Sequence, residues 1–193
     1  MSRVAETSAP IHPVLAERWS PRSFDPTKSL TMADLTPAFE AARWAPSANN
    51  AQEWRFLVGF RGDATFAALT ERLSGWNASW APMAGAIVIG MYEEDPENRA
   101  SEYASYDLGQ AMAHFSVQAH ADGLYVHQAA GFDRDAVAEY FNVPANWRVF
   151  VAAAVGHLGA PELLNETLLA RETAPRVRRP LDETVFTGPF ASA

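Results

Sequence analysis

Hydrophobic residues follow a strand-like spacing in four stretches of the chain. In Trp54–Phe60 large side chains alternate with others, which is typical of a strand that buries one face. Residues 84–92 and 149–155 are almost continuously apolar, as expected for central strands covered on both faces. A shorter run at residues 124–128 predicts a fourth strand. Together these stretches predict one sheet at the centre of the protein.

Helical spacing of apolar residues fills the intervals between these strands. The clearest start is at Thr31, because a threonine followed three positions later by Asp34 is the capping-box pattern. Pro46 lies just past the end of the same helix, where it cannot continue the backbone pattern. The predicted helices cover residues 12–19, the segment from Thr31 to just before Pro46, and residues 63–73, 102–121 and 133–141.

The chain loses this regularity after Pro161. Residues 165–193 are predicted to form an extended arm that has no core of its own. A long arm that is neither compact nor of low complexity needs a surface to pack on, and a partner subunit is the obvious one. No internal repeat or linker divides the chain, so residues 1–193 are predicted to form a single domain.

Composition excludes several classes of function. The net charge is -8, and the basic residues form no continuous run, which argues against nucleic acid or an anionic membrane as the main partner. The chain has no cysteine, so disulfides, thiolate catalysis and cysteine-ligated metal centres are excluded. The longest apolar stretch, residues 81–91, is shorter than the ~20 residues that span a bilayer. We therefore expect a cytoplasmic protein without a metal site.

Three polar segments carry the candidate chemistry. Residues 18–24 read RWSPRSF, residues 46–56 read PSANNAQEWRF, and residues 176–181 read RVRRPL. Guanidinium groups and a hydroxyl suit a phosphate, because they offer charge-assisted and often bidentate hydrogen bonds. Carboxamides and hydroxyls suit the edge of a flat heterocycle that has both donors and acceptors. A phosphorylated heteroaromatic cofactor is indicated, and FMN fits best.

The order of these segments resembles that of the nitroreductase family of FMN-dependent oxidoreductases. The resemblance runs from Arg18 to Val185, nearly the whole chain. It implies an α+β, three-layer fold with a mostly antiparallel sheet flanked by helices. It also implies a homodimer in which the C-terminal strand joins the other subunit's sheet and FMN lies at the subunit interface.

On the phosphate side, the resemblance assigns FMN contacts to both arginine-rich segments. The alternatives are surface residues at a helix end and a tail kept soluble by its charge. In an extended tail, residues two apart point to the same side, so Arg176 and Arg178 face together. Arg22 would be the cation near flavin N1 and O2. The implied residues are Arg18, Trp19 (through its backbone), Ser20, Arg22, Arg176 and Arg178.

On the ring side, the resemblance implies contacts from three further places. The first is the loop before the first strand, the second is Asn77, and the third is the turn at Ala130, whose backbone amide would point at flavin N5. The alternatives are a polar loop, a helix C-cap and a simple turn glycine. The implied residues are Pro46, Ser47, Asn50, Gln52, Asn77, Ala130 and Gly131.

The function implied by the resemblance is hydride transfer from NADH or NADPH to FMN, followed by ping-pong transfer to a small acceptor such as a nitroaromatic or a quinone. Ala130 and Arg22 would be the residues closest to the chemistry. The alternative is a flavin-binding carrier or sensor that turns over nicotinamide poorly. A third interpretation, an interaction domain without a cofactor, requires a colourless protein.

Overall fold

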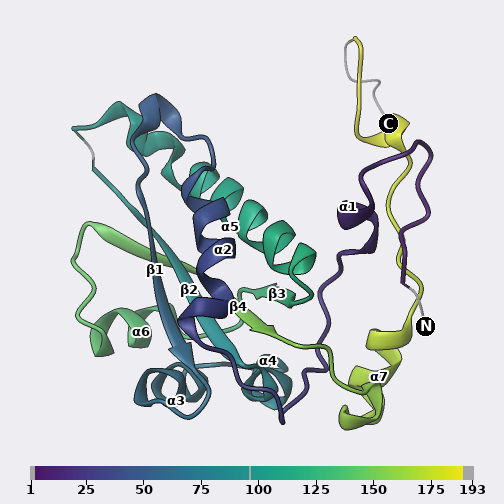
Figure 1. The fold of residues 1–193 in the computed structure, drawn as a ribbon. Coiled ribbons are helices and arrows are strands. Elements are labelled where there is room, and N and C mark those ends of the chain that lie inside the picture. The colour runs from purple at the N-terminus through teal and green to yellow at the C-terminus, as the bar shows by residue number, and fades with distance from the viewer. Residues whose placement is uncertain (1–2, 96, 189–193) are drawn as a thin grey trace.

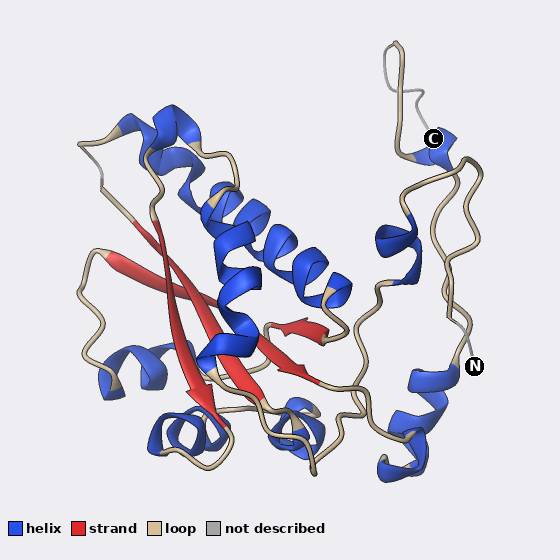
Figure 2. Cartoon of the chain, viewed as in Figure 1, coloured by secondary structure: helices blue, strands red, loops and turns tan. Residues whose placement is uncertain are grey.

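The computed structural model describes residues 3–95 and 97–188, and it contains a four-stranded sheet flanked by helices (Figures 1 and 2). The sheet order is β1-β2-β4-β3, and every neighbouring pair is antiparallel. The predicted α+β class with an antiparallel sheet is therefore confirmed. The strands are β1 (Trp54–Phe60), β2 (Ala86–Glu93), β3 (Tyr125–Ala129) and β4 (Trp147–Gly156).

Helices cover both faces of this sheet (Figure 1). The long helix α5 and helix α2 lie side by side on one face, and α3, α4 and α6 contribute to the core on the other. None of the helices in the described part of the chain is long and apolar enough to cross a membrane. The helices are α1 (Pro13–Glu17), α2 (Met32–Arg43), α3 (Ala64–Glu71), α4 (Asn77–Trp80), α5 (Ala104–Ala121), α6 (Arg134–Tyr140) and α7 (Glu166–Thr173).

The core explains why β2 reads as an unbroken apolar run. Val88 packs with Leu108 of α5 on one side of the sheet, whereas Ile87 and Ile89 belong to the core on the other side. Successive side chains of a strand point to opposite faces, so a strand with a core on each face needs apolar residues at every position. The two layers of core fix the sheet and, with it, the strand ends that carry the candidate site.

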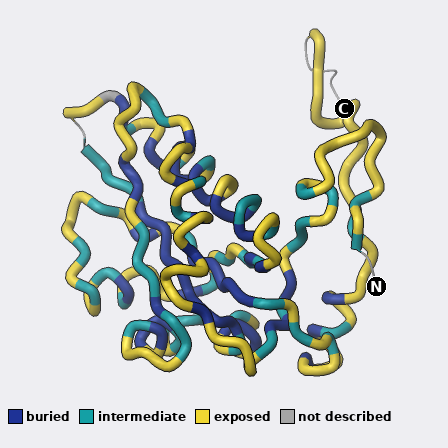
Figure 3. Tube along the Cα trace, in the orientation of Figure 1, coloured by how far each residue is buried: buried dark blue, intermediate teal, exposed yellow. Residues whose placement is uncertain are grey.

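The end of the chain differs from the predicted extended arm. Residues from Asn165 onward first form helix α7, because the Asn165 side chain accepts a hydrogen bond from the backbone N–H of Leu168 at 3.0 Å and caps the helix. The arm begins only after Thr173 and is mostly exposed in the single chain (Figure 3). The last five residues of the predicted arm lie outside the described ones.

Candidate functional site

A cavity of about 180 Å³ lies where the segment after α1 meets the segment after α7. We call it the arginine pocket. The structure brings together there the two arginine-rich segments that the sequence predicted to share one phosphate. It also adds two arginines that the sequence analysis did not single out, Arg3 and Arg171. The cavity is lined by Arg3, Arg18, Trp19, Ser20, Arg22, Arg171, Arg176 and Arg178.

Arg176 fixes the shape of this pocket through backbone carbonyls. Its guanidinium donates to the carbonyl oxygens of Ala16 at 2.8 Å and Arg18 at 2.9 Å, and also to that of Arg3. Arg3 in turn donates from Nη2 to the carbonyl of Ala174 at 2.8 Å. These bonds join the N-terminal segment to the start of the arm. Arg176 therefore joins the two segments by hydrogen bonds, and it also lines the pocket.

Positive charge in the pocket exceeds negative charge. Burial, and then the neighbouring Arg178, lower the pKa of Arg18. Burial lowers the pKa of Arg176, and Arg18 and Arg178 lower it further. Guanidinium groups stay charged at neutral pH, so the lowered pKa values reflect the cost of burying these charges and, after it, the repulsion between them. A bound anion would relieve that repulsion.

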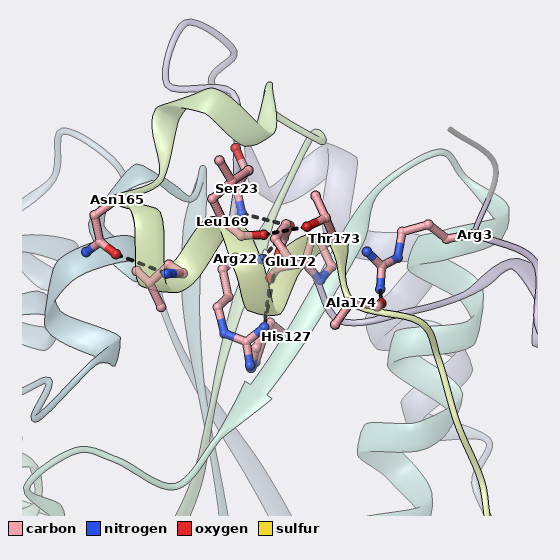
Figure 4. Close-up of polar contacts among 11 residues, drawn as sticks. Arg3, Arg22, Ser23, His127, Asn165, Leu169, Glu172, Thr173 and Ala174 are labelled. Carbon is pink, nitrogen blue, oxygen red and sulfur yellow. Dashed lines mark hydrogen bonds and ion pairs between the residues drawn. The ribbon is translucent and has the colours of Figure 1, made fainter.

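Glu172 is the buried acid of the site, with 3% of its surface exposed. Both of its carboxylate oxygens accept the backbone N–H of Arg22 at 3.0 Å, and Oε1 also accepts the N–H of Ser23 at 3.2 Å (Figure 4). Its Oε2 lies 3.8 Å from Nη1 of Arg22. Helix α7 thus holds the Arg22 segment in place. The positive charge of Arg22, which the resemblance places near flavin N1 and O2, is therefore partly balanced by Glu172.

The sequence contained one signal for Glu172. It lies four residues after Leu168, and on a helix that spacing places both residues on the same face. Leu168 is buried against the core, so an acid on this face has to find internal donors. Glu172 was not predicted as a site residue, because residues 166–173 were not predicted to form a helix.

His127 supports the same segment from the sheet side. Its Nδ1 lies 2.8 Å from the carbonyl oxygen of Pro21, and its ring centroid lies 4.4 Å from that of Trp80. Burial lowers the pKa of His127 to about 4, so the ring is neutral at pH 7 and Nδ1–H donates to Pro21. Strand β3 thereby fixes the backbone between Ser20 and Arg22.

Asn77 and Gly131 lie against each other. The Nδ2 of Asn77, at the start of α4, donates to the carbonyl of Gly131 at 3.1 Å. A Cβ at position 131 would lie 2.6 Å from that nitrogen, so a larger residue there would displace the Asn77 amide from this position. The guanidinium of Arg171 lies 5.5 Å from the ring centroid of Trp76, which precedes Asn77. Arg171 therefore links the arginine pocket to the Asn77 and Ala130 side predicted to meet the flavin ring.

The loop that holds Pro46, Ser47, Asn50 and Gln52 lies elsewhere. It follows α2 and packs near the start of α5, at the other end of the molecule from α7 (Figure 1). The backbone N–H of Ala48 donates to the buried carboxylate of Asp107 in α5 at 2.7 Å. A single chain does not bring this loop to the arginine pocket, so a site built from both requires two chains.

The backbone of this loop is unusual. Asn49, Asn50 and Gln52 all have positive φ angles, of 52°, 59° and 55°. Non-glycine residues rarely adopt this left-handed conformation, and asparagine tolerates it best. Such strain persists where the surrounding structure imposes it, often at ligand-binding sites. Here the N–H of Gln52 donates to Oγ of Ser47 at 3.1 Å and closes the loop.

Glu53 follows this loop and is buried. Neither of its carboxylate oxygens has a hydrogen-bond partner among the described residues. Burial raises the pKa of Glu53, and the nearby carboxylates of Asp107 and Glu93 raise it further. A buried, unpaired carboxylate costs free energy when it is ionised.

We expect Glu53→Gln to raise the free energy of unfolding at neutral pH by on the order of 1 kcal/mol. A carboxyl whose pKa is raised in the folded protein holds its proton more tightly there, so its contribution to stability falls as pH rises from the unfolded toward the folded pKa. The gain should therefore disappear below pH 4.5, the ordinary value for this carboxyl. Urea unfolding of the variant and of the parent protein at pH 7 and below pH 4.5 measures this gain. Glu71→Gln, at an exposed position of α3, is the control and should change stability little at either pH. An equal gain at acidic pH would contradict it.

Comparisons with known proteins identify the family of the chain and proteins that share its fold. The sequence profile of the nitroreductase family matches residues 15–157. A 15.4 kDa protein of Mycolicibacterium smegmatis is 37% identical over 142 residues, which cover 69% of this chain and 95% of the relative.

Among the described residues, no group of histidines and acids is suited to hold a metal ion.

Solved structures extend the likeness to the whole chain. The crystal structure of an oxidoreductase containing FMN is 30% identical, covers 100% of this chain and 99% of its own, and gives a TM-score of 0.91. A Staphylococcus epidermidis protein assigned as an NAD(P)H:FMN oxidoreductase is 18% identical, with coverage of 90% and 93% and a TM-score of 0.74. The second likeness concerns the fold alone.

Proposed function

This chain belongs to the nitroreductase family, and from that premise we propose that it is an FMN-dependent oxidoreductase. It would take hydride from NADH or NADPH and pass the electrons to a small acceptor such as a nitroaromatic or a quinone. The observation that carries the proposal is the arginine pocket, whose surplus of positive charge calls for an anion such as the phosphate of FMN. The crystal structure of an FMN-containing oxidoreductase with the same fold supports it.

The residues present fit this cofactor. Arg18 and Arg178 would meet the phosphate, and Ser20 would meet the ribityl chain next to it. Asn77 would hold the polar edge of the ring, and the backbone amide of Ala130 would orient N5. When bound, FMN supplies the hydride and electron chemistry, while the chain supplies position and electrostatics. One cleft serving donor and acceptor in turn is expected to give ping-pong kinetics.

The single chain also offers a place for a partner. Strand β1 is an edge of the sheet in the described part of the chain. Beside it lies a cavity of about 460 Å³ whose lining includes Phe39, Trp54 and Phe56. The arm carries exposed Leu181 and Val185, which have no core in their own chain. An unpaired edge and an apolar groove together form a docking surface for an extended segment.

We propose that the arm of a second copy fills this groove and pairs with β1. Such a homodimer supplies the loop that the single chain leaves distant from the pocket. Ser47, Asn50 and Gln52 of one subunit would then face FMN held by the arginines of the other. Two subunits complete each site under this arrangement.

An absorption spectrum and an anaerobic reduction test the function. The purified protein is expected to be yellow, with the visible bands of an oxidised flavin. Mixing with NADH or NADPH without oxygen should bleach these bands rapidly. A yellow protein that neither donor bleaches would be a flavin carrier or sensor instead. A colourless protein that cannot take up FMN would reject both.

A further inference from the structure

Glu53 joins the loop of residues 46–52, which we call the Ser47 loop, to strand β1. It follows Gln52, whose φ angle of 55° is left-handed, and it precedes Trp54, the first residue of β1. The carbonyl oxygen of Glu53 accepts the backbone N–H of Glu93 in β2 at 2.9 Å. The sheet therefore fixes the backbone of Glu53, and the side chain has to lie where that backbone places it.

The side chain of Glu53 lies in a place that does not balance a negative charge. Only 5% of the residue is exposed, and neither carboxylate oxygen has a hydrogen-bond partner among the described residues. Burial raises the pKa of Glu53, Asp107 of α5 and Glu93 of β2 raise it further, and its own backbone N–H opposes them in part. The nearby cation, Arg55 of β1, donates instead to the carbonyl oxygen of Trp54 at 2.7 Å. The uncharged carboxyl suits these surroundings better than the ionised one.

Asp107 connects this carboxyl to the other end of the Ser47 loop. It is buried, and its Oδ2 accepts the backbone N–H of Ala48 at 2.7 Å. At the near end, the backbone N–H of Gln52 donates to Oγ of Ser47 at 3.1 Å. An ionised Glu53 would bring a second negative charge close to that of Asp107, and like charges in a protein interior repel. A movement of either acid relieves the repulsion, and each acid holds one end of the loop.

We propose that Glu53 is a positioning residue for the flavin ring: its uncharged carboxyl keeps the Ser47 loop in the conformation that meets the ring, and its ionisation releases the loop. This inference rests on the proposed flavin function and on the homodimer in which the loop faces the other subunit's flavin. The held loop binds the proton of Glu53 more tightly than the released loop, in which the carboxyl has its ordinary pKa of 4.5. Flavin affinity should therefore fall as the pH rises from 4.5 toward the raised pKa, and level off above it.

The test is the pH dependence of riboflavin binding to the flavin-free protein, followed by flavin fluorescence between about pH 5 and about pH 8. Riboflavin has the ring but no phosphate, so the titration of a phosphate does not contribute. The parent protein should bind riboflavin about tenfold more weakly at the upper pH, the change that one unit of pKa difference gives. In the Glu53→Gln variant the affinity should stay within about twofold of the parent's value at the lower pH. Glu71→Gln, at an exposed position of α3, should follow the parent.

The difference between the parent and the Glu53→Gln variant decides the inference. Equal pH profiles for the two proteins overturn it, and so does a parent affinity that does not change with pH. If riboflavin binds too weakly to measure, the same comparison with FMN replaces it, because the phosphate titrates alike in both proteins. Tight binding of FMN with equal pH profiles leaves the proposed function standing without the inference, whereas binding of neither flavin overturns both.

Discussion

Replacing Glu172 by alanine should lower the free energy of unfolding by about 3 kcal/mol, because it leaves the backbone donors of Arg22 and Ser23 without their shared acceptor. The segment between α1 and α2 would lose its anchor on α7. FMN retention should therefore fall along with stability. Urea unfolding and flavin content of the purified variant measure the two effects.

The control for this substitution is Glu166→Ala, at the exposed start of the same helix. Loss of a charge there should cost no more than about 0.5 kcal/mol, the value of an exposed helix-dipole interaction. Glu172→Gln should fall between the two, because its amide oxygen still accepts one N–H. Equal stability of the Glu172→Ala and Glu166→Ala variants would show that the buried carboxylate does not hold the segment.

Removing residues 180–193 should convert the proposed dimer into a monomer that retains FMN poorly. The truncated chain keeps Arg176 and Arg178 but loses the apolar residues of the arm, and the groove beside β1 stays uncovered. Each arginine pocket would then lack the loop supplied by the other subunit. We expect the affinity for FMN to fall by roughly a hundredfold, which corresponds to about 3 kcal/mol of lost contacts.

Light scattering and FMN titration measure these two losses. Met32→Glu provides an independent change on the receiving side, because Met32 is half exposed and lines the groove. It should weaken the dimer without altering the arm. A truncated chain that remains dimeric and binds FMN normally would reject the exchange of arms.

The sheet could be predicted from the sequence because burial of one or both faces gives each strand a characteristic spacing of apolar residues. The bounds predicted for β1 match those observed, and the apolar run of β2 reflects a core on each face. The capping pair at Thr31 also formed, with the backbone N–H of Thr31 donating to Asp34 at 2.7 Å. These features depend on local chemistry or on a periodic pattern, so one sequence suffices to find them.

The site was harder to predict because it depends on contacts between distant parts of the chain. Helix α7 was missed, since it is short, most of its residues are polar and only Asn165 marks its start. Glu172 was missed with it, and so was the ion pair of Glu172 with Arg22. The loop that holds Ser47 lies far from the arginine pocket. No sequence motif indicates this distance, because it depends on how the whole chain folds.

We propose above all that the arginine pocket binds the phosphate of a flavin. The direct measurement is the affinity of the flavin-free protein for FMN compared with riboflavin, which has the same ring but no phosphate. Charge-assisted hydrogen bonds contribute about 1.5–3 kcal/mol each, so two of them predict binding of FMN at least about a hundredfold tighter. Equal affinities for the two flavins would contradict the account.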